Sequence, residues 1–376
     1  MKICYLANAS SIHTQRWVKY FADKGHEVHL ISPRPFDGDI ENVKLHLLKR
    51  YSQIRILSFM ANLPFEIFQV RKIIKKIKPD IVHAHYIATY GFHAALTKFH
   101  PLVLSVWGSD VLVAPKKSYF VKMMVKYALK KADIVTATAK FMKGYLVKEF
   151  KISEEKIIRI PWGIDLKIFH RGYEKEVKKL REELDIPYDA PVIISNRALS
   201  PKYNIHLIVE SMPYVIKNYP NAVFIFIRGY GTEEFEEKLI RLAKNLGVNK
   251  NLKIIPKLIS PREMAVYLNL SDIMISIPST DQFASSVMEG MACGTIPIVS
   301  NIEAYKQYLE DGKNAFFVSL NDPQELAKKI ICAIDHLPKL KDKFYRLNKK
   351  IIEEHENWEK NAIKMEELYE KLAGGK

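Results

Sequence analysis

Short apolar runs alternate along the chain with longer stretches that have the spacing of an amphipathic helix. Several runs are followed by Gly, Pro, Ser or Asp, which is typical of strands that end in loops. In the first half, this pattern predicts strands at 3–6, 27–31, 80–85, 102–106, 134–136 and 156–160. It predicts helices at 16–24, 64–77 and 116–131, the first ended by Gly25 and the second by Pro79.

The second half repeats the alternation. Strands are predicted at 191–195, 222–228, 252–255, 272–277 and 296–300. Helices are predicted at 205–218, 233–246, from about 284–286 to Gly294, and at 323–336, and a charged stretch at 338–356 leads to a final amphipathic helix at 357–372. Strands that alternate with helices favour parallel sheets covered on both faces. Because 376 residues are many for one core, we expect two doubly wound α/β domains, joined near 165–185.

The most informative segment for function is 279–294. Asp281 lies in its Ser/Thr-rich loop, and Glu289 lies in the short helix that follows. The loop is at the carboxyl end of a predicted strand, where open α/β sheets bind ligands, and the helix start offers N–H groups to phosphate. Carboxylates accept hydrogen bonds from sugar hydroxyls, so the segment predicts a site for a phosphorylated sugar compound. The alternative is that both acids are simply solvated.

Positive charge is concentrated in the first half. The chain has a net charge of +16, and residues 1–170 contain 28 Lys and Arg against 13 Asp and Glu. This asymmetry favours an anionic partner, although lysines that only solubilise the domain would look the same. In the predicted helix 116–131, Lys122, Lys126 and Lys130 form a basic stripe beside Phe120, Met123, Met124 and Tyr127. Such a helix suits an anionic membrane surface.

Other classes of function lack their signals in the sequence. The first strand is followed by ANASSI at 7–12, not by the G-x-G-x-x-G turn of nicotinamide-dependent dehydrogenases. We find no nucleic-acid reading motif, and therefore expect no nucleic-acid partner. The cysteines Cys4, Cys293 and Cys332 are far apart and have no metal-ligand spacing, so we expect no metal site and a reducing compartment.

Over nearly its whole length, the chain resembles the retaining glycosyltransferases of family 4. The motifs are, in order, IHTQRWV at 12–18 with GHEV at 25–28, PDIVHAH at 79–85, Asn196-Arg197 with Lys202, the acidic pair Asp281 and Glu289, MACG at 291–294 with PIVS at 297–300, and the final helix. The resemblance implies the GT-B fold, in which two Rossmann-like domains face a central cleft. It implies an acceptor-side domain at 1–170, a nucleotide-sugar domain at 171–352, and a helix at 353–376 that returns to the first domain.

The resemblance also implies roles for individual residues. Arg197 and Lys202 would neutralise the diphosphate of the donor, and with Asp281 they would form the catalytic set. Glu289 would accept the ribose hydroxyls. The remaining donor-binding positions would be Gly229, Pro256, Lys257, Phe283, Ala284, Ser285 and Ser286. Each assignment has a simpler alternative. Lys202 could be a solvent-exposed lysine, and the pair Ser285 and Ser286 could only cap the helix. Gly229 and Gly231 could only serve a tight turn.

The chain departs from the family pattern at several positions. The first acid is Asp281 where Glu is usual, and Trp107 stands where many members have a histidine near the reacting sugar. His13, His85 and Trp107 are therefore the acceptor-side candidates, Trp107 through stacking on a sugar face. Ser10-Ser11, Trp162 and Gly290 replace the usual glycine pair, Asn and Ala. The Gly290 exchange is expected to cost about 1 kcal/mol of helix propensity.

The expected function is transfer of a sugar from a nucleotide sugar, with UDP favoured over GDP, to an acceptor hydroxyl. Retention of the anomeric configuration and independence of a metal follow from the resemblance, and no cofactor is expected besides the nucleotide sugar. The acceptor would be a soluble saccharide or a lipid-linked glycan. The protein would be cytoplasmic, either free or at the inner face of the membrane. The alternatives are a GT-B-shaped sugar-nucleotide epimerase and an inactive scaffold.

Overall fold

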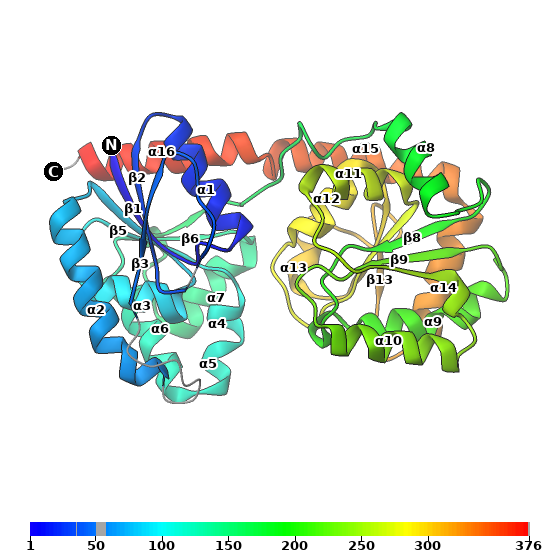
Figure 1. Cartoon of the computed structure of the whole chain (residues 1–376), viewed down its shortest axis with the longest axis horizontal. Coiled ribbons are helices and arrows are strands. Elements are labelled where there is room, and N and C mark those ends of the chain that lie inside the picture. Colours follow the sequence, from blue (N-terminus) through cyan, green and yellow to red (C-terminus); the bar gives the residue numbers. More distant parts are fainter. Residues whose placement is uncertain (35, 50–57, 375–376) are drawn as a thin grey trace. The chain divides into compact units, whose positions relative to one another are not determined.

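The structure is a computed structural model that describes residues 1–34, 36–49 and 58–374. Two compact units divide the chain: Met1–Pro161 with Lys360–Lys376, and Trp162–Glu359. Each unit is a parallel sheet with helices on both faces (Figure 1). These are two Rossmann-like domains, as the alternating pattern predicts.

The first unit contains a seven-stranded sheet in the order β3-β2-β1-β4-β5-β6-β7, in which every pair is parallel. The order reverses between β1 and β4, where Tyr5 is in register with His83. The strands are β1 (Lys2–Leu6), β2 (Glu27–Ser32), β3 (Val43–Leu47), β4 (Ile81–His85), β5 (Leu102–Ser105), β6 (Ile134–Ala137) and β7 (Ile157–Arg159).

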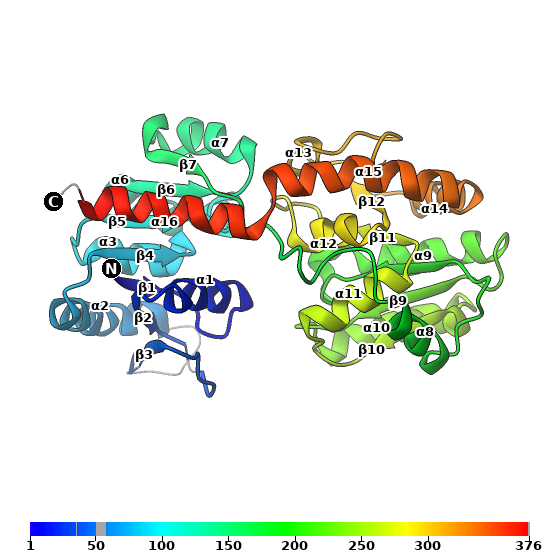
Figure 2. The same cartoon turned by 90° about the horizontal axis from the view of Figure 1, so that it is seen from above.

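Helices cover both faces of this sheet. Their bounds are α1 (Ile12–Asp23), α2 (Ser58–Ile77), α3 (Phe92–Leu96), α4 (Ser109–Leu112), α5 (Ala114–Lys117), α6 (Tyr119–Lys131) and α7 (Lys140–Phe150), with a π-helical turn at Ile87–Gly91 and a 3-10 turn at Glu154–Lys156. On one face α2 packs on α3 and α3 packs on α6. On the other, α16 (Trp358–Gly374) lies over the sheet beside α1 (Figure 2), and the rings of Tyr369 and Phe21 stack 4.9 Å apart.

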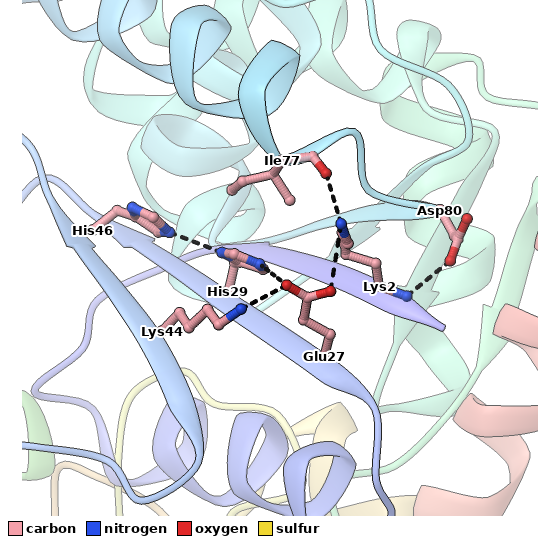
Figure 3. Close-up of polar contacts among 7 residues, drawn as sticks. All are labelled: Lys2, Glu27, His29, Lys44, His46, Ile77 and Asp80. Atoms are coloured by element: carbon pink, nitrogen blue, oxygen red, sulfur yellow. Dashed lines mark hydrogen bonds and ion pairs between the residues drawn. The ribbon is translucent and has the colours of Figure 1, made fainter.

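A network of polar contacts joins the first three strands and the residues Ile77 and Asp80 before β4 (Figure 3). Glu27 Oε1 lies 2.7 Å from Lys44 Nζ and 3.1 Å from His29 Nε2, and Lys2 Nζ is 3.4 Å from its other oxygen. His29 and His46 are linked by a ring nitrogen contact of 2.9 Å. Because the network ties β1, β2 and β3 together, it stabilises this edge of the sheet.

The second unit contains a six-stranded parallel sheet in the order β10-β9-β8-β11-β12-β13. Its order reverses between β8 and β11. The strands are β8 (Val192–Ser195), β9 (Val223–Ile227), β10 (Leu252–Ile255), β11 (Ile273–Ser276), β12 (Ile296–Ser300) and β13 (Phe316–Val318).

Two apolar cores flank this second sheet. One includes Ile205, Leu239 and Ile330, and the other includes Leu268, Val287 and Ile352. The helices that cover the sheet are α8 (Glu174–Glu183), α9 (Ile205–Ile216), α10 (Glu233–Asn245), α11 (Pro261–Leu270), α12 (Ser285–Cys293), α13 (Glu303–Lys306), α14 (Pro323–Asp335) and α15 (Leu337–His355), with 3-10 turns at Pro201–Tyr203 and Asn249–Asn251.

The structure corrects the predicted helix at 116–131. Ser118 has an extended backbone (φ −155°, ψ 126°) and separates α5 from α6, and its hydroxyl accepts the N–H of Val121 as an N-cap. Two members of the predicted apolar face differ in exposure, because Met124 is buried in the core whereas Met123 is exposed. The charged stretch at 338–356 is also a helix, α15, and the helix predicted from Pro64 begins earlier, at Ser58.

Candidate active site

In the second unit, two loops meet where the strand order reverses. One follows β8 and carries Asn196, Arg197 and Lys202, and the other follows β11 and carries Asp281. The second loop leads into α12, whose first turn contains Ser285 and Ser286. The carboxyl ends of strands at such a reversal are the usual ligand site of a doubly wound sheet. Topology thus brings the predicted diphosphate residues to one place.

Arg197 is the centre of this cluster. Its Nη1 donates to Ser286 Oγ and its Nη2 to Asp281 Oδ2, both at 2.8 Å. The guanidinium carbon lies 4.0 Å from the centroid of the Tyr203 ring, a stacked cation–π contact. Burial acts to lower the pKa of the guanidinium, but the charge of Asp281 and two nearby phenols raise it above its ordinary value. The side chain is therefore a fixed positive charge, although only 8% of the residue is exposed.

The two loops are joined by further hydrogen bonds. Asn196 Nδ2 donates to the carbonyl of Ser286 at 3.0 Å, and Asn204 Nδ2 donates to that of Ile277 at 2.8 Å. Asp281 Oδ1 accepts the backbone N–H of Gln282 at 2.8 Å. These contacts hold Arg197 and Asp281 in fixed positions before any ligand arrives, which is the preorganisation that charge stabilisation requires.

The alternative in which Ser285 and Ser286 only cap α12 does not match the N-cap of that helix. Ala284 occupies the N-cap position, and its side chain makes no capping hydrogen bond. Phe283 and Ala284 are buried, and the hydroxyl of Ser286 is engaged by Arg197. The first turn of α12 therefore lies beside the guanidinium, and the backbone N–H groups of a helix start together with a guanidinium suit an anion. Glu289 lies one turn further along α12 and is half-buried.

Gly231 explains how the turn after β9 reaches this cluster. A Cβ atom on Gly231 would lie 2.4 Å from the carbonyl oxygen of Leu199, so only glycine allows the turn to pack against the loop that carries Arg197. Gly229 has a left-handed backbone (φ 55°), and a Cβ there would meet Ala198 at an ordinary 3.7 Å. Gly231 thus allows the turn to approach the backbone of Leu199 closely, and Gly229 provides the left-handed conformation of the turn.

The other predicted donor residues lie around this cluster. Lys202 is exposed, and its Nζ is 5.3 Å from the centroid of the Tyr203 ring. The carbonyl of Pro256 accepts a hydrogen bond from the Arg228 guanidinium, and Lys257 Nζ pairs with Glu263 at 3.1 Å. In the loop after β10, Pro256 and Lys257 therefore already have polar partners within the second unit.

In the first unit, the three acceptor-side candidates come together. His13 follows β1, His85 ends β4 and Trp107 follows β5, which again places them where the strand order reverses. The Trp107 ring centroid is 5.9 Å from that of His13 and 5.6 Å from that of His85. The group combines an indole face with two imidazoles, and these are side chains that can stack on a sugar ring and bond its hydroxyls.

Both imidazoles are neutral at physiological pH. Burial lowers the pKa of His85 to about 3, and burial together with the charge of Arg16 lowers that of His13 to about 3. His85 is 2% exposed, and its Nδ1 has no hydrogen-bond partner among the described residues. In a neutral imidazole one ring nitrogen donates a hydrogen bond and the other accepts one, so Nδ1 of His85 has unused bonding capacity at this site.

The two histidines of the PDIVHAH strand have different environments. His83 Nε2 lies 2.7 Å from Ser105 Oγ, and its Nδ1 is hydrogen-bonded to the Tyr369 hydroxyl of α16. That hydroxyl lies 2.8 Å from the one of Tyr5. His83 therefore anchors the C-terminal helix to the sheet, and only His85 is directed to Trp107.

Sequence reasoning missed Asp110 and Tyr203. Asp110 is fully buried and accepts the backbone N–H groups of Ile87 at 2.8 Å and Trp107 at 3.0 Å. Burial raises the pKa of this carboxyl to about 6, against the effect of those hydrogen bonds. Asp110 thus positions Trp107. The feature of the sequence that could have indicated this role is an acidic residue three positions after the tryptophan. Tyr203 directly follows Lys202, but nothing in the sequence shows that its ring stacks on Arg197.

Known proteins identify this arrangement. A sequence model of the glycosyl transferases group 1 matches residues 176–365, and one described as glycosyl transferase 4-like matches residues 2–139. The chain belongs to the group 1 glycosyltransferases of family 4. It is therefore a glycosyltransferase with the GT-B fold.

Individual relatives span most of this glycosyltransferase. It is 24% identical over 370 residues to an uncharacterized glycosyltransferase of Methanocaldococcus jannaschii, covering 96% of this chain and 94% of the relative. It is 26% identical to the alpha-monoglucosyldiacylglycerol synthase of Acholeplasma laidlawii, covering 82% and 80%. The crystal structure of Anabaena HepE in complex with UDP-glucose matches with a TM-score of 0.82 at 17% identity, covering 99% and 100%.

The described residues, 1–34, 36–49 and 58–374, also bear on metals and membranes. No group of three or more His, Cys, Asp or Glu side chains among them is arranged to hold a metal ion. No helix among them is long and apolar enough to cross a membrane.

Proposed function

We propose that this glycosyltransferase transfers a sugar from a UDP-sugar to an acceptor hydroxyl with retention of the anomeric configuration. The observation that carries the proposal is the preorganised cluster of Arg197, Asp281 and the start of α12 where the strand order of the second unit reverses. A guanidinium and free helix N–H groups bind a diphosphate, and an adjacent carboxylate binds hydroxyls.

Each residue has a defined part in this proposal. Arg197 binds the diphosphate and Lys202, exposed on the same loop, supplies a second positive charge. Asp281 accepts hydroxyls of the transferred sugar, and Glu289 accepts those of the ribose. The loop containing Pro256 and Lys257 receives the base.

The chemistry would consist mainly of stabilising the leaving group. As the bond between the anomeric carbon and the phosphate oxygen breaks, negative charge develops on the UDP, and Arg197 and Lys202 would stabilise it. Because these two cations neutralise that charge, we propose that turnover needs no metal ion. Retention would follow if the leaving phosphate oxygen accepts the proton of the acceptor hydroxyl on the same face of the sugar.

UDP is the proposed nucleotide because HepE, a protein of the same fold, binds UDP-glucose. On the acceptor side, the proposal assigns His85 and His13 to hydroxyl hydrogen bonds and Trp107 to stacking on a sugar face. The unused Nδ1 of the buried, neutral His85 supports this assignment.

We further propose a lipid-linked or membrane-surface acceptor. The start of α6 exposes Tyr119 (78%), Phe120 (49%) and Met123 (47%), next to the exposed Lys116 and Lys117 of α5. Apolar side chains beside lysines suit the interface of an anionic bilayer. The relative from Acholeplasma laidlawii is named for the synthesis of a glycosyldiacylglycerol, which supports a lipid acceptor here.

A transfer assay tests the proposal. UDP-glucose, UDP-galactose and UDP-N-acetylglucosamine would each be incubated with vesicles that contain diacylglycerol or a sugar linked to polyprenyl diphosphate, and UDP release and the anomeric proton of the product would be measured. The expected result is acceptor-dependent UDP release and an α-linked product from an α-donor, lost by about a hundredfold or more in Arg197→Ala. A changed sugar without UDP release would indicate the epimerase alternative. No turnover of any donor would contradict the proposal.

A further inference from the structure

Arg197 already has a counter-ion within the chain. Its Nη2 is bound to Asp281 Oδ2 at 2.8 Å, and the two side chains are only 9% and 16% exposed. A buried guanidinium needs a compensating negative charge, and Asp281 supplies it. A diphosphate that binds to Arg197 must therefore share the guanidinium with a carboxylate that is already there.

Asp281 cannot easily move away to make room. Its other oxygen accepts the backbone N–H of Gln282 at 2.8 Å, and the aspartate arm is short. The Arg197 guanidinium is fixed as well, by Ser286 on one side and the Tyr203 ring on its face. A bound diphosphate would thus lie close to a stationary negative charge, and like charges at such distances repel strongly in a partly buried site.

We propose that Asp281 makes the site select the sugar-carrying nucleotide over the nucleoside diphosphate alone. This inference rests on the proposed function. The hydroxyls of the transferred sugar donate hydrogen bonds to Asp281 and offset the repulsion. UDP offers no such donors and carries more negative charge on its terminal phosphate, so it meets Asp281 without compensation.

The same competition has a consequence for turnover. Once the sugar has left, Asp281 loses its hydroxyl partners and competes for Arg197 with a more highly charged phosphate. Asp281 thus weakens the binding of the product more than that of the donor. The Arg197–Asp281 pair would speed nucleotide release at the end of each cycle.

Calorimetry with UDP and UDP-glucose as probes tests the inference on the full chain. In Asp281→Asn we expect UDP to bind about tenfold more tightly, because one negative charge beside the diphosphate is removed. UDP-glucose should bind within about threefold of the wild type or more weakly, since it gains from lower repulsion and loses its hydroxyl acceptor. Asp281→Ser, which removes the charge with a smaller side chain, should shift the ratio of the two dissociation constants in the same direction.

Two control variants separate this role from a general loss of charge or structure. Glu289→Gln should weaken UDP and UDP-glucose alike, because both carry the ribose. Glu237→Gln, on the exposed side of α10, should change neither. If the wild type binds UDP but neither Asp281 variant binds it more tightly, the inference is wrong and the proposed function stands. If the wild type binds neither probe, the proposed function itself fails, and the inference fails with it.

Discussion

At the scale of single residues, the donor site depends on the shape of a guanidinium as well as on its charge. Arg197 donates hydrogen bonds to Asp281 and Ser286 from different nitrogens, and the flat face of its guanidinium stacks on the ring of Tyr203. Lys202 is exposed and offers only a point charge. The geometry therefore predicts unequal contributions from the two cations to nucleotide binding.

Arg197→Lys should weaken UDP binding by about 2–3 kcal/mol, the value of charge-assisted hydrogen bonds that a lysine cannot reproduce. Lys202→Ala should cost about 1 kcal/mol or less, as expected for an exposed charge. Equilibrium dialysis with labelled UDP measures both, and Arg241→Lys on the exposed side of α10 is the matched control. Equal losses for the two variants would contradict the central position of Arg197.

Asp110 gives a prediction for pH dependence. Its folded-state pKa of about 6 lies above the ordinary value of 3.8 because of burial, so the folded state holds this proton more tightly than the unfolded state. The contribution of Asp110 to stability is therefore fully present below about pH 4 and is lost as the pH rises through 6.

Compared with Asp110→Asn, the wild type should lose about 2–3 kcal/mol of free energy of unfolding between pH 4 and pH 7, at about 1.4 kcal/mol per pKa unit. Urea unfolding of both proteins across this range measures the difference. A difference that stays constant with pH would show that the Asp110 carboxyl is not perturbed as described.

At the scale of elements, the packing around a helix decides whether a glycine in it stabilises or destabilises the fold. Gly290 and Gly144 both lie inside helices, α12 and α7. A Cβ on Gly290 would lie 2.8 Å from Met274 Cγ and from Thr295 Oγ1, whereas one on Gly144 would meet nothing within 4 Å. Helix propensity alone predicts that alanine is more stable than glycine at both positions. The structure shows that alanine fits at position 144 and is too large at position 290.

Gly290→Ala should lower the free energy of unfolding by about 1–3 kcal/mol, because the added methyl overpacks the contact between α12 and β11. Gly144→Ala should raise it by about 0.5–1 kcal/mol, the usual gain of alanine over glycine in an exposed helix. Thermal or chemical unfolding of the two variants checks both signs. A stabilised Gly290→Ala protein would mean that α12 does not pack as described.

The hydrophobic pattern of the sequence predicted most of the helices and strands and missed the others. The strands at 252–255 and 296–300 were predicted at their observed bounds, since both are short runs rich in Ile, Leu and Val with turn or polar residues on either side. β3 was missed because its edge position mixes polar and apolar residues, and β13 was missed although the equally short β7 was predicted. α11 was missed although Ser260 and Glu263 form a capping box, which is a signal readable in the sequence.

The candidate site was predictable to a similar extent. The motifs indicated Arg197, Asp281 and Ser286, and the fold places them in direct contact. They did not indicate that the three would already be bonded to one another, because contacts between loops distant in sequence depend on the strand order. For the same reason the network from His83 to Tyr369, which spans most of the chain, could not be foreseen.

At the scale of the whole molecule, charge is distributed unevenly, with 28 basic against 13 acidic residues in 1–170. If the proposed membrane surface is correct, the protein should sediment with vesicles that contain phosphatidylglycerol and not with neutral ones. Binding should fall as salt rises from 0.05 to about 0.5 M, since screening shortens the reach of the lysines.

The double variant Phe120→Ser/Met123→Ser should sediment several-fold less, because it removes apolar area that would enter the interface. Tyr188→Ser, which alters a similarly exposed aromatic residue of the second unit, should sediment as the wild type does. Sedimentation independent of lipid charge and of α6 would contradict the membrane surface and leave a soluble acceptor.

The central claim is that the second unit binds the diphosphate of a nucleotide sugar through Arg197. The most direct measurement is calorimetric titration of UDP, GDP, ADP and NAD into the wild type and Arg197→Ala. The account predicts selective binding of UDP by the wild type and its loss by at least about tenfold in the variant. Binding of NAD alone, no binding at millimolar ligand, or equal binding by Arg197→Ala would contradict it.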